Sequence, residues 1–261
     1  MKTHLRITQF ALIIPILLLA ITAVAAETGI PDPVVKKTLP AEIHTECLNP
    51  EYFFYQPQSI GNKEPLPLLI YLHGKGERGT KIWKVRKHGP LKKSPDGIDF
   101  PFAILAPQCL KDEEGQGWWK TEDLQLLLQH VMATENIDPK RITLSGNSMG
   151  GAGTLAWASA HPTQFAAIAP ICGATSENFD PSPLKELPIW IFHGAKDPIV
   201  PLKRSQDIVD ALTAIGSSVK FTIYPEAKHD SWSESYTNPE LYQWLLEHSA
   251  AVGFKNDDPH N

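Results

Sequence analysis

The sequence predicts a single α/β domain with a mainly parallel central sheet and helices on both faces. Its 261 residues, 42% hydrophobic and 20% charged, are typical of a globular chain large enough to bury one core. From about residue 66, short apolar runs alternate with amphipathic helical patterns, which indicates strand–helix–strand units. The runs are apolar throughout, as strands covered on both faces are. Because only residues 73–100 and 107–121 form long connections, no large cap domain is expected.

Residues 1–26 have the features of a cleavable signal peptide. Lys2 and Arg6 precede an apolar run, and small residues ending in Ala26 close it. An uncleaved membrane anchor is the alternative, because the apolar run is nearly long enough to cross a bilayer. With cleavage, we expect one domain over residues 27–261, secreted or periplasmic and not stably inserted in the membrane. The exact cleavage position stays open.

The strands and helices follow from the same patterns. Six apolar runs ended by Gly, Pro, His or Ser are predicted as strands, at residues 68–72, 102–106, 142–144, 165–169, 189–192 and 219–224. Apolar residues at helical spacing predict three helices, around residues 124–131, 208–215 and 239–245. The segment before them, about residues 31–55, is expected to supply early antiparallel strands.

The charge pattern argues against a nucleic-acid partner. The formal net charge is −5, and loss of a signal peptide that carries only basic charges would make it more negative. One stretch departs from this pattern, since eight basic residues between Lys75 and Lys93 face the single acid Glu77. A solvated loop and helix face is one interpretation, and a patch that steers an anionic substrate is the other.

Cys47, Cys109 and Cys172 are an odd number of cysteines. In an oxidising compartment at most one disulfide can form within the chain, and the sequence does not select the pair or exclude three free thiols. Their spacing resembles no metal site, and no metal is expected.

The segment around Ser148 is typical of a nucleophilic serine. A short apolar run ending at Leu144 leads into Gly146-Asn147-Ser148-Met149-Gly150-Gly151, and a helix of small residues follows. Glycines allow the backbone to double back, and the strained turn exposes the serine side chain at the edge of the sheet. An ordinary serine at a helix start is the alternative. The context of strand, turn and helix predicts Ser148 as a nucleophile.

A serine hydroxyl needs a base, and a histidine base works best with a carboxylate on its other ring nitrogen. Asp197 follows the predicted strand 189–192, and His229 follows the last strand. The order Ser, Asp, His is the one expected for this arrangement. Glu226 is the alternative acid, although it lies on the same loop as the histidine. His73 and His193 also end strands, but the glycine after each indicates a turn residue.

Acyl transfer needs donors for the oxyanion. One should be the backbone N–H of Met149, directly after the nucleophile. The second is expected from the glycine-rich loop after strand 68–72, where we select the N–H of Lys75; a plain glycine turn is the alternative. Glu77 and Arg78 are expected to pair and hold this loop.

Three tryptophans are candidates for the wall of a substrate pocket: Trp118, Trp119 and Trp232. Aromatic surface near a site suits planar or apolar substrates. Packing in the core is the alternative for each, most of all for Trp119.

The motifs together resemble those of a known superfamily. They are YLHGKGERG at Tyr71, APQC at Ala106, SGNSMGG at Ser145, APICGA at Ala169, FHGAKDPIVP at Phe192 and KHDSW at Lys228. The chain resembles the α/β-hydrolase superfamily over about residues 66–246. Within it, the chain is similar to secreted esterases, some labelled peptidases, that are related to polyhydroxyalkanoate depolymerases, feruloyl esterases and the phospholipase/carboxylesterase family.

The resemblance implies a triad of Ser148, Asp197 and His229, with oxyanion donors from Lys75 and Met149. Lys75 stands where such proteins usually have a small residue, so its side chain is expected to narrow or charge the pocket. No metal or organic cofactor is implied.

The expected activity is hydrolysis of short-chain or aromatic acyl esters, of small molecules or polysaccharides, through an acyl-enzyme. A serine peptidase with the same triad and a catalytically inactive binding protein are the alternatives. The oligomeric state is not predicted.

Overall fold

The computed structural model describes residues 33–57, 64–92 and 100–251. The signal peptide predicted at residues 1–26 therefore lies outside the described residues, and so does its alternative as an anchor. Within the ranges described, no helix combines the length and the hydropathy needed to cross a membrane.

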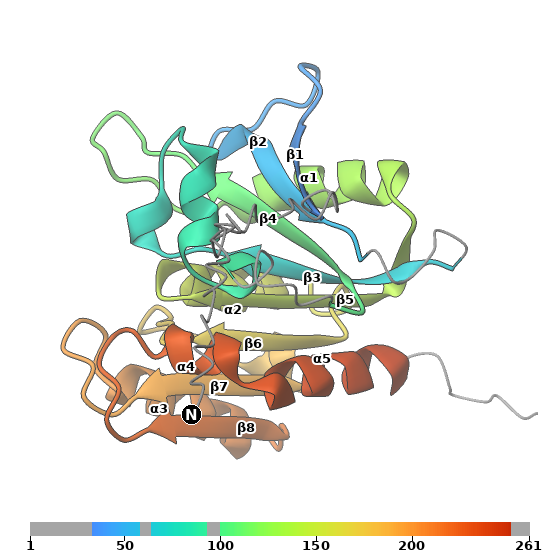
Figure 1. Ribbon diagram of the computed structural model, residues 1–261. Coiled ribbons are helices and arrows are strands. Elements are labelled where there is room, and N and C mark those ends of the chain that lie inside the picture. The colour runs from blue at the N-terminus through green and yellow to red at the C-terminus, as the bar shows by residue number, and fades with distance from the viewer. Residues whose placement is uncertain (1–32, 58–63, 93–99, 252–261) are drawn as a thin grey trace, which may run out of the picture. The chain divides into compact units, whose positions relative to one another are not determined.

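An eight-stranded mixed sheet forms the centre of the domain (Figure 1), in the spatial order β1-β2-β4-β3-β5-β6-β7-β8. The strands are β1 (Val34–Thr38), β2 (Leu48–Tyr55), β3 (Leu66–Leu72), β4 (Ala103–Cys109), β5 (Ile137–Asn147), β6 (Ala167–Ile171), β7 (Ile189–Gly194) and β8 (Val219–Tyr224). The β1–β2 and β2–β4 pairs are antiparallel, and all pairs from β4 to β8 are parallel. The predicted fold class and the early antiparallel strands are confirmed.

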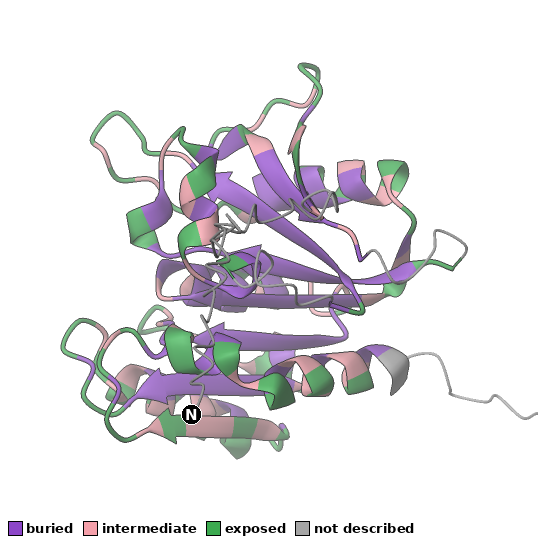
Figure 2. Cartoon of the chain, viewed as in Figure 1, coloured by how far each residue is buried: buried purple, intermediate pink, exposed green. Residues whose placement is uncertain are grey.

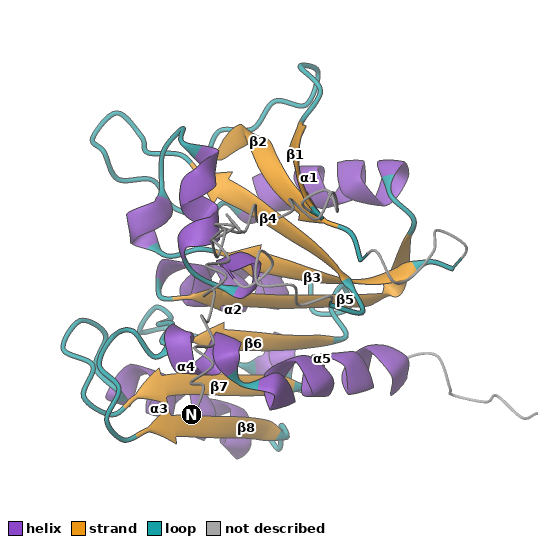
Figure 3. Ribbon diagram, in the orientation of Figure 1, coloured by secondary structure: helices purple, strands orange, loops and turns teal. Residues whose placement is uncertain are grey.

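Helices cover both faces of this sheet (Figure 3). One face packs against α1 (Thr121–Thr134), α2 (Met149–Ala160) and α3 (Lys203–Ala214). The other packs against α4 (Trp232–Thr237), α5 (Pro239–Ala251) and two short 3₁₀ helices, η2 (Ile82–Lys87) and η3 (Pro90–Lys92). Two further 3₁₀ turns are η1 (Lys75–Glu77) and η5 (Ser182–Leu184). The sequence patterns missed α4, because six residues are too few to show helical periodicity.

The central strands have no solvent-facing side, as their continuous apolar runs predict. In β3, Leu68 and Ile70 join the hydrophobic cluster under α1 and α2, whereas Leu69 and Tyr71 join the cluster on the opposite face. This alternation follows from the two-residue period of a strand. Figure 2 shows the central strands buried over most of their length. Full burial of each such side chain contributes about 1.5–3 kcal/mol.

The parallel arrangement determines where a site can form. The carboxyl ends of β3 to β8 lie along one edge of the sheet, so the loops that follow these strands meet there. All the candidate polar residues lie in these loops. The described part of the predicted long connection after β3, residues 73–92 and 100–102, contains only the short turns η1, η2 and η3.

All three cysteines are buried free thiols in this structure. Cys47 and Cys109 lie close enough to form a side-chain hydrogen bond, which, together with burial, raises the pKa of Cys47. The same bond lowers the pKa of Cys109. Cys172 lies apart from this pair, directly after β6.

Candidate active site

The turn that carries Ser148 connects β5 to α2 and is strained. Ser148 has φ 55° and ψ −115°, a conformation that a residue with a side chain rarely adopts. Its N–H donates to the carbonyl of Ile171 on the neighbouring strand β6, 2.8 Å away. The turn also needs Gly150, because a Cβ there would lie 1.9 Å from the carbonyl oxygen of Leu72. Backbone contacts on both sides therefore hold the serine at the edge of the sheet, where its side chain is half-buried.

A continuous chain of hydrogen bonds joins the three residues predicted as a triad. The Oγ of Ser148 lies 2.9 Å from Nε2 of His229. The Nδ1 of His229 lies 2.7 Å from Oδ2 of Asp197. His229 comes from the loop after β8 and Asp197 from the loop after β7. The fold thus brings together three segments that are far apart in the sequence.

The surroundings of Asp197 favour its ionised form. Its side chain is fully buried, and its Oδ1 accepts hydrogen bonds from the N–H groups of Ile199 and Val200 at 2.8 and 2.9 Å. Burial by itself would raise the pKa of Asp197, but the bonds from His229 and these two N–H groups outweigh it and lower the pKa. A charged carboxylate is what orients a histidine base and stabilises its protonated form.

His193 is a second histidine against this carboxylate. Its Nε2 lies 3.3 Å from Oδ2 of Asp197 and 2.8 Å from the carbonyl oxygen of Val200. Its Nδ1 is within 2.7 Å of the Ser205 hydroxyl. Burial lowers the pKa of His193, which favours the neutral form of its ring. The sequence indicated only a turn residue here, and the structure adds a packing contact that supports the carboxylate.

Glu226, the alternative acid, forms no hydrogen bond with His229 among the described residues. Its side chain is 83% exposed and forms an ion pair with Lys196. Among the described carboxylates, Asp197 is the one bonded to the histidine.

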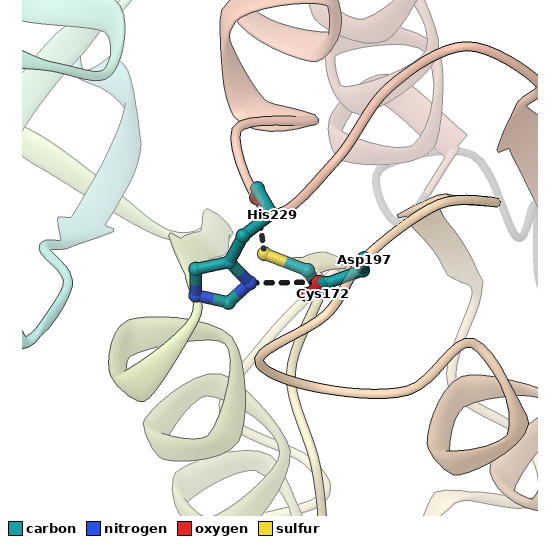
Figure 4. Close-up of side chains that lie close together, drawn as sticks. All are labelled: Cys172, Asp197 and His229. Carbon is teal, nitrogen blue, oxygen red and sulfur yellow. Dashed lines mark hydrogen bonds and ion pairs between the residues drawn. The ribbon is translucent and has the colours of Figure 1, made fainter.

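Cys172 lies beside this histidine, as Figure 4 shows. Its Sγ lies 3.6 Å from the carbonyl oxygen of His229, and its φ of 41° is also positive. The side-chain atoms of Cys172, Asp197 and His229 that could ligate a metal lie within 4.8 Å of one another. However, burial raises the pKa of the thiol to about 12, and the carboxylate and the imidazole are already bonded to each other. Since a metal ligand must be deprotonated and available, we interpret the cluster as packing around the histidine.

The predicted oxyanion donors lie at the starts of two short elements. Met149 is the first residue of α2, and Lys75 is the first residue of η1. Over the described ranges neither N–H donates to a protein acceptor. The loop of Lys75 lies against the nucleophile turn, since a Cβ on Gly74 would be 3.5 Å from the carbonyl oxygen of Asn147.

The predicted pairing of Glu77 with Arg78 is wrong. The Nε of Arg78 donates to the carbonyl of Lys75 at 3.1 Å, and its Nη1 donates to the carbonyl of Gly117 at 2.7 Å. Arg78 is buried and fastens the loop after β3 to the loop after β4. A guanidinium with several donors satisfies two backbone carbonyls better than one neighbouring carboxylate would.

Two buried side chains that the sequence did not single out also hold this region. The amide of Gln108 donates to the carbonyls of Glu77 and Lys81 at 2.7 and 2.9 Å. The hydroxyl of Tyr71 donates to Oδ1 of Asn147, directly before the nucleophile, at 2.9 Å. Both residues stand within motifs that carry the family resemblance, YLHGKGERG and APQC, but a contact with a distant segment leaves no local pattern that would indicate it.

The three candidate tryptophans have different surroundings. Trp118 is 54% exposed on the loop after β4, whereas Trp119 is buried and donates to the carbonyl of His73 at 3.3 Å. Trp119 therefore supports the loop of Lys75 from inside the core. Trp232 is half-buried and lies edge-on to His229, with ring centroids 5.3 Å apart. Trp118 and Trp232 remain candidates for the pocket wall.

Comparison with known proteins finds similar esterases and thioesterases. The sequence profile of the phospholipase/carboxylesterase family matches residues 100–239. An acyl-protein thioesterase 1 of Gibberella zeae is 29% identical over 209 residues, which cover 67% of this chain and 88% of that protein. The crystal structure of a thermostable esterase has a TM-score of 0.70 and 30% identity, covering 83% of this chain and 63% of the other. A ferulic acid esterase has a TM-score of 0.61 and 19% identity, covering 83% and 98%, and shares the fold.

The sheet, the nucleophile turn and these similarities define the chain as an α/β-hydrolase that hydrolyses carboxylic esters. More narrowly, it belongs to the phospholipase/carboxylesterase family. The resemblance stated from the sequence motifs is confirmed.

Proposed function

We propose that this protein is a secreted serine carboxylesterase in which Ser148 is the nucleophile, His229 the general base and Asp197 the residue that orients the base. The observation that carries the proposal is the unbroken path of hydrogen bonds from Ser148 Oγ through the imidazole to the buried carboxylate. Because the serine already lies within hydrogen-bond distance of the base, the proton can leave as the Ser148 oxygen attacks.

The reaction follows from this arrangement in two steps. Ser148 attacks the ester carbonyl while His229 takes its proton, and the N–H groups of Lys75 and Met149 stabilise the oxyanion. The protonated His229 then gives this proton to the leaving alcohol, which releases it and forms the acyl-enzyme. A water molecule deprotonated by His229 attacks the acyl-enzyme, and collapse of the second oxyanion returns the proton to Ser148 and frees the acid.

Short-chain or aromatic acyl esters are the proposed substrates, including esters carried by polysaccharides. Within the described residues, the loops after β3 and β4 contain short turns and no apolar lid, and a long acyl chain needs an extended apolar groove. Two similar proteins, an acyl-protein thioesterase and a ferulic acid esterase, support this proposal, because by their names one removes acyl groups from proteins and the other cleaves esters of an aromatic acid.

We also propose that residues 1–26 are removed on export, which places the substrate outside the cytoplasm. The support comes from the sequence, in the basic start, apolar run and small residues of this segment. Mass spectrometry of the protein recovered from cells expressing the full sequence tests this, since a mature chain that still begins at Met1 would contradict it.

The central experiment is a substrate panel with the wild type and a Ser148→Ala variant. We expect hydrolysis of acetyl, butyryl and benzoyl aryl esters, with the specificity constant falling for acyl chains beyond about ten carbons. Ser148→Ala should lose more than about a thousandfold in turnover, as removal of a triad nucleophile does. Ser218→Ala is the matched control, because that exposed serine precedes β8 at the opposite edge of the sheet.

A fluorophosphonate probe gives an independent readout of the same claim. Mass spectrometry should find the probe on Ser148 and no labelling of the alanine variant. Turnover of Ser148→Ala within a hundredfold of the wild type would refute the assignment of the nucleophile. Preferential cleavage of peptide anilides over all esters would assign the alternative peptidase activity.

A further inference from the structure

A groove with a volume of about 480 Å³ lies between the loop after β3 and the loop after β4. The loop after β3 contributes Lys75 and Arg78, and the loop after β4 contributes residues between Leu110 and Lys120. Glu46 and Cys47, from the segment before β2, complete the lining. The groove therefore shares Lys75 with the predicted oxyanion site. Neither the triad nor the family resemblance assigns it a role.

The two walls of this groove are held in place by polar contacts. Buried Arg78 donates to the carbonyl of Lys75 on one wall and to the carbonyl of Gly117 on the other, at 3.1 and 2.7 Å. On the second wall, Asp112 accepts hydrogen bonds from the N–H groups of Gln116 and Gly117 at 2.5 and 2.9 Å. Such bracing reduces the ordering that a ligand must impose when it binds.

The lining of the groove combines an aromatic surface with an excess of positive charge, because its four basic side chains outnumber the acids Glu46 and Asp112. Trp118 is 54% exposed, although tryptophan favours burial. Lys120 is paired with Glu46, and each carboxylate oxygen of Asp112 already accepts a backbone N–H. In contrast, Lys75 and Lys111 are exposed and form no ion pair with any described residue. A flat ring with an anionic substituent complements this combination.

The order of the strands indicates which part of an ester the groove receives. β5 carries the nucleophile turn; β3 and β4 lie on one side of it, and β7 and β8 lie on the other. The groove loops follow β3 and β4, whereas Asp197 and His229 follow β7 and β8. Figure 1 shows these two pairs of strands on opposite sides of β5. The leaving alcohol must lie beside His229 to receive its proton. The groove loops follow strands on the other side of β5, which is the side left for the acyl part.

We propose that this groove is the acyl subsite for an aromatic acyl group that bears a second, anionic substituent such as a carboxylate. The ring stacks on Trp118, and the anionic substituent lies between Lys75 and Lys111. This assignment rests on the proposed esterase function and narrows it to half-esters of aromatic dicarboxylic acids and acyl groups of the same chemistry.

Four 4-methylumbelliferyl esters with one leaving group test the assignment: acetyl, benzoyl, 4-carbamoylbenzoyl and 4-carboxybenzoyl. The last two differ mainly in charge. For the wild type we expect kcat/KM to be about three- to fivefold higher for the carboxylate ester than for the carboxamide ester, because an exposed ion pair strengthens binding by about this factor. This ratio should fall toward one in Lys111→Gln and in Lys75→Gln, and also in the wild type at 0.5 M salt, which screens exposed charges.

Trp118→Ala should lower kcat/KM for both substituted benzoyl esters relative to acetyl by about three- to tenfold, the worth of an aromatic contact. Lys140→Gln and Trp83→Ala are the matched controls. Lys140 lies in the first half of β5, at the other end of the strand, and Trp83 is an exposed tryptophan outside the groove. Both controls should keep the wild-type ratios.

The outcomes separate this assignment from the esterase function itself. If the acetyl ester is cleaved but the carboxylate ratio is unchanged in both lysine variants, the groove assignment is overturned and the esterase function stands. If a carboxyphenyl leaving group on an acetate shows the lysine-dependent preference instead, the groove binds the alcohol and the acyl assignment is wrong. If no ester is cleaved, both proposals fail.

Discussion

At the scale of single residues, a buried carboxylate whose surroundings favour its ionised form is the central feature of this site. Asp197 accepts hydrogen bonds from His229 and from two backbone N–H groups, and its pKa is lowered despite its burial. Glu226 lies three residues before His229 in the sequence but is exposed and paired with Lys196. Proximity in sequence therefore does not identify the orienting acid.

These two carboxylates give a matched pair of substitutions. Asp197→Asn should lower kcat by on the order of 10⁴-fold, because an amide no longer fixes the tautomer of the histidine. Glu226→Gln should stay within about twofold of the wild type, since an exposed ion pair contributes little. Steady-state kinetics on a short-chain aryl ester measure both. A severe loss in Glu226→Gln with a mild one in Asp197→Asn would reassign the acid.

At the scale of elements, the junction of β3, β5 and α2 leaves no room for a side chain at Gly146 and Gly150, the two glycines that flank the nucleophile. A Cβ on Gly150 would lie 1.9 Å from the carbonyl oxygen of Leu72, and one on Gly146 would lie 2.4 Å from the carbonyl oxygen of Gly150. The neighbours are backbone atoms, which cannot rotate away as the end of a flexible side chain can. Close packing of helix on strand is thus what places the serine at the edge of the sheet.

Gly150→Ala should therefore lower the free energy of unfolding by about 1–3 kcal/mol or more, as overpacking of a tight interior does. Gly76→Ala is the control, because a Cβ at Gly76 meets no atom within 4 Å. Urea unfolding followed by circular dichroism compares the two variants. Equal stability of Gly150→Ala and the wild type would contradict the packing described for this turn.

At the scale of the whole molecule, neutral buried histidines link stability to pH. His73 is fully buried, and its Nε2 accepts the N–H of Cys109 at 2.9 Å. Burial lowers the pKa of His73 from 6.5 to about 4, and burial also lowers the pKa of His193. Between pH 6.5 and about pH 4, His73 binds a proton in the unfolded chain but not in the folded chain. Its contribution to the free energy of unfolding is therefore complete above pH 6.5 and is lost as the pH falls toward 4.

We expect His73 to cause a loss on the order of 3 kcal/mol in the free energy of unfolding between pH 7 and pH 4. Urea unfolding at pH 7.0, 5.5 and 4.5 measures the slope, which should be shallower in His73→Gln. His44→Gln, at an exposed position, is the control and should keep the wild-type slope. An identical slope in His73→Gln would show that this histidine does not contribute.

The local features were accessible from the sequence because each is set by neighbouring residues. Continuous apolar runs predicted the parallel sheet, since strands covered on both faces cannot alternate with polar residues. The candidate nucleophile Ser148 followed from a strand, a glycine turn and a small-residue helix that are contiguous in the chain. The order of Ser148, Asp197 and His229 indicated the rest of the candidate triad.

Only the tertiary structure decided what depends on segments distant in the sequence. Trp118 and Trp119 are adjacent, yet Trp118 is exposed and Trp119 lies in the core. The sequence could not distinguish them, because a loop has no periodic pattern that indicates which side chain is buried. Arg78 contacts Gly117 across 39 residues, and Tyr71 contacts Asn147 across 76. Sequence patterns indicate which faces of strands and helices are apolar. Which loops meet is decided by the folded chain, so the groove between the loops after β3 and β4 is visible only in the tertiary structure.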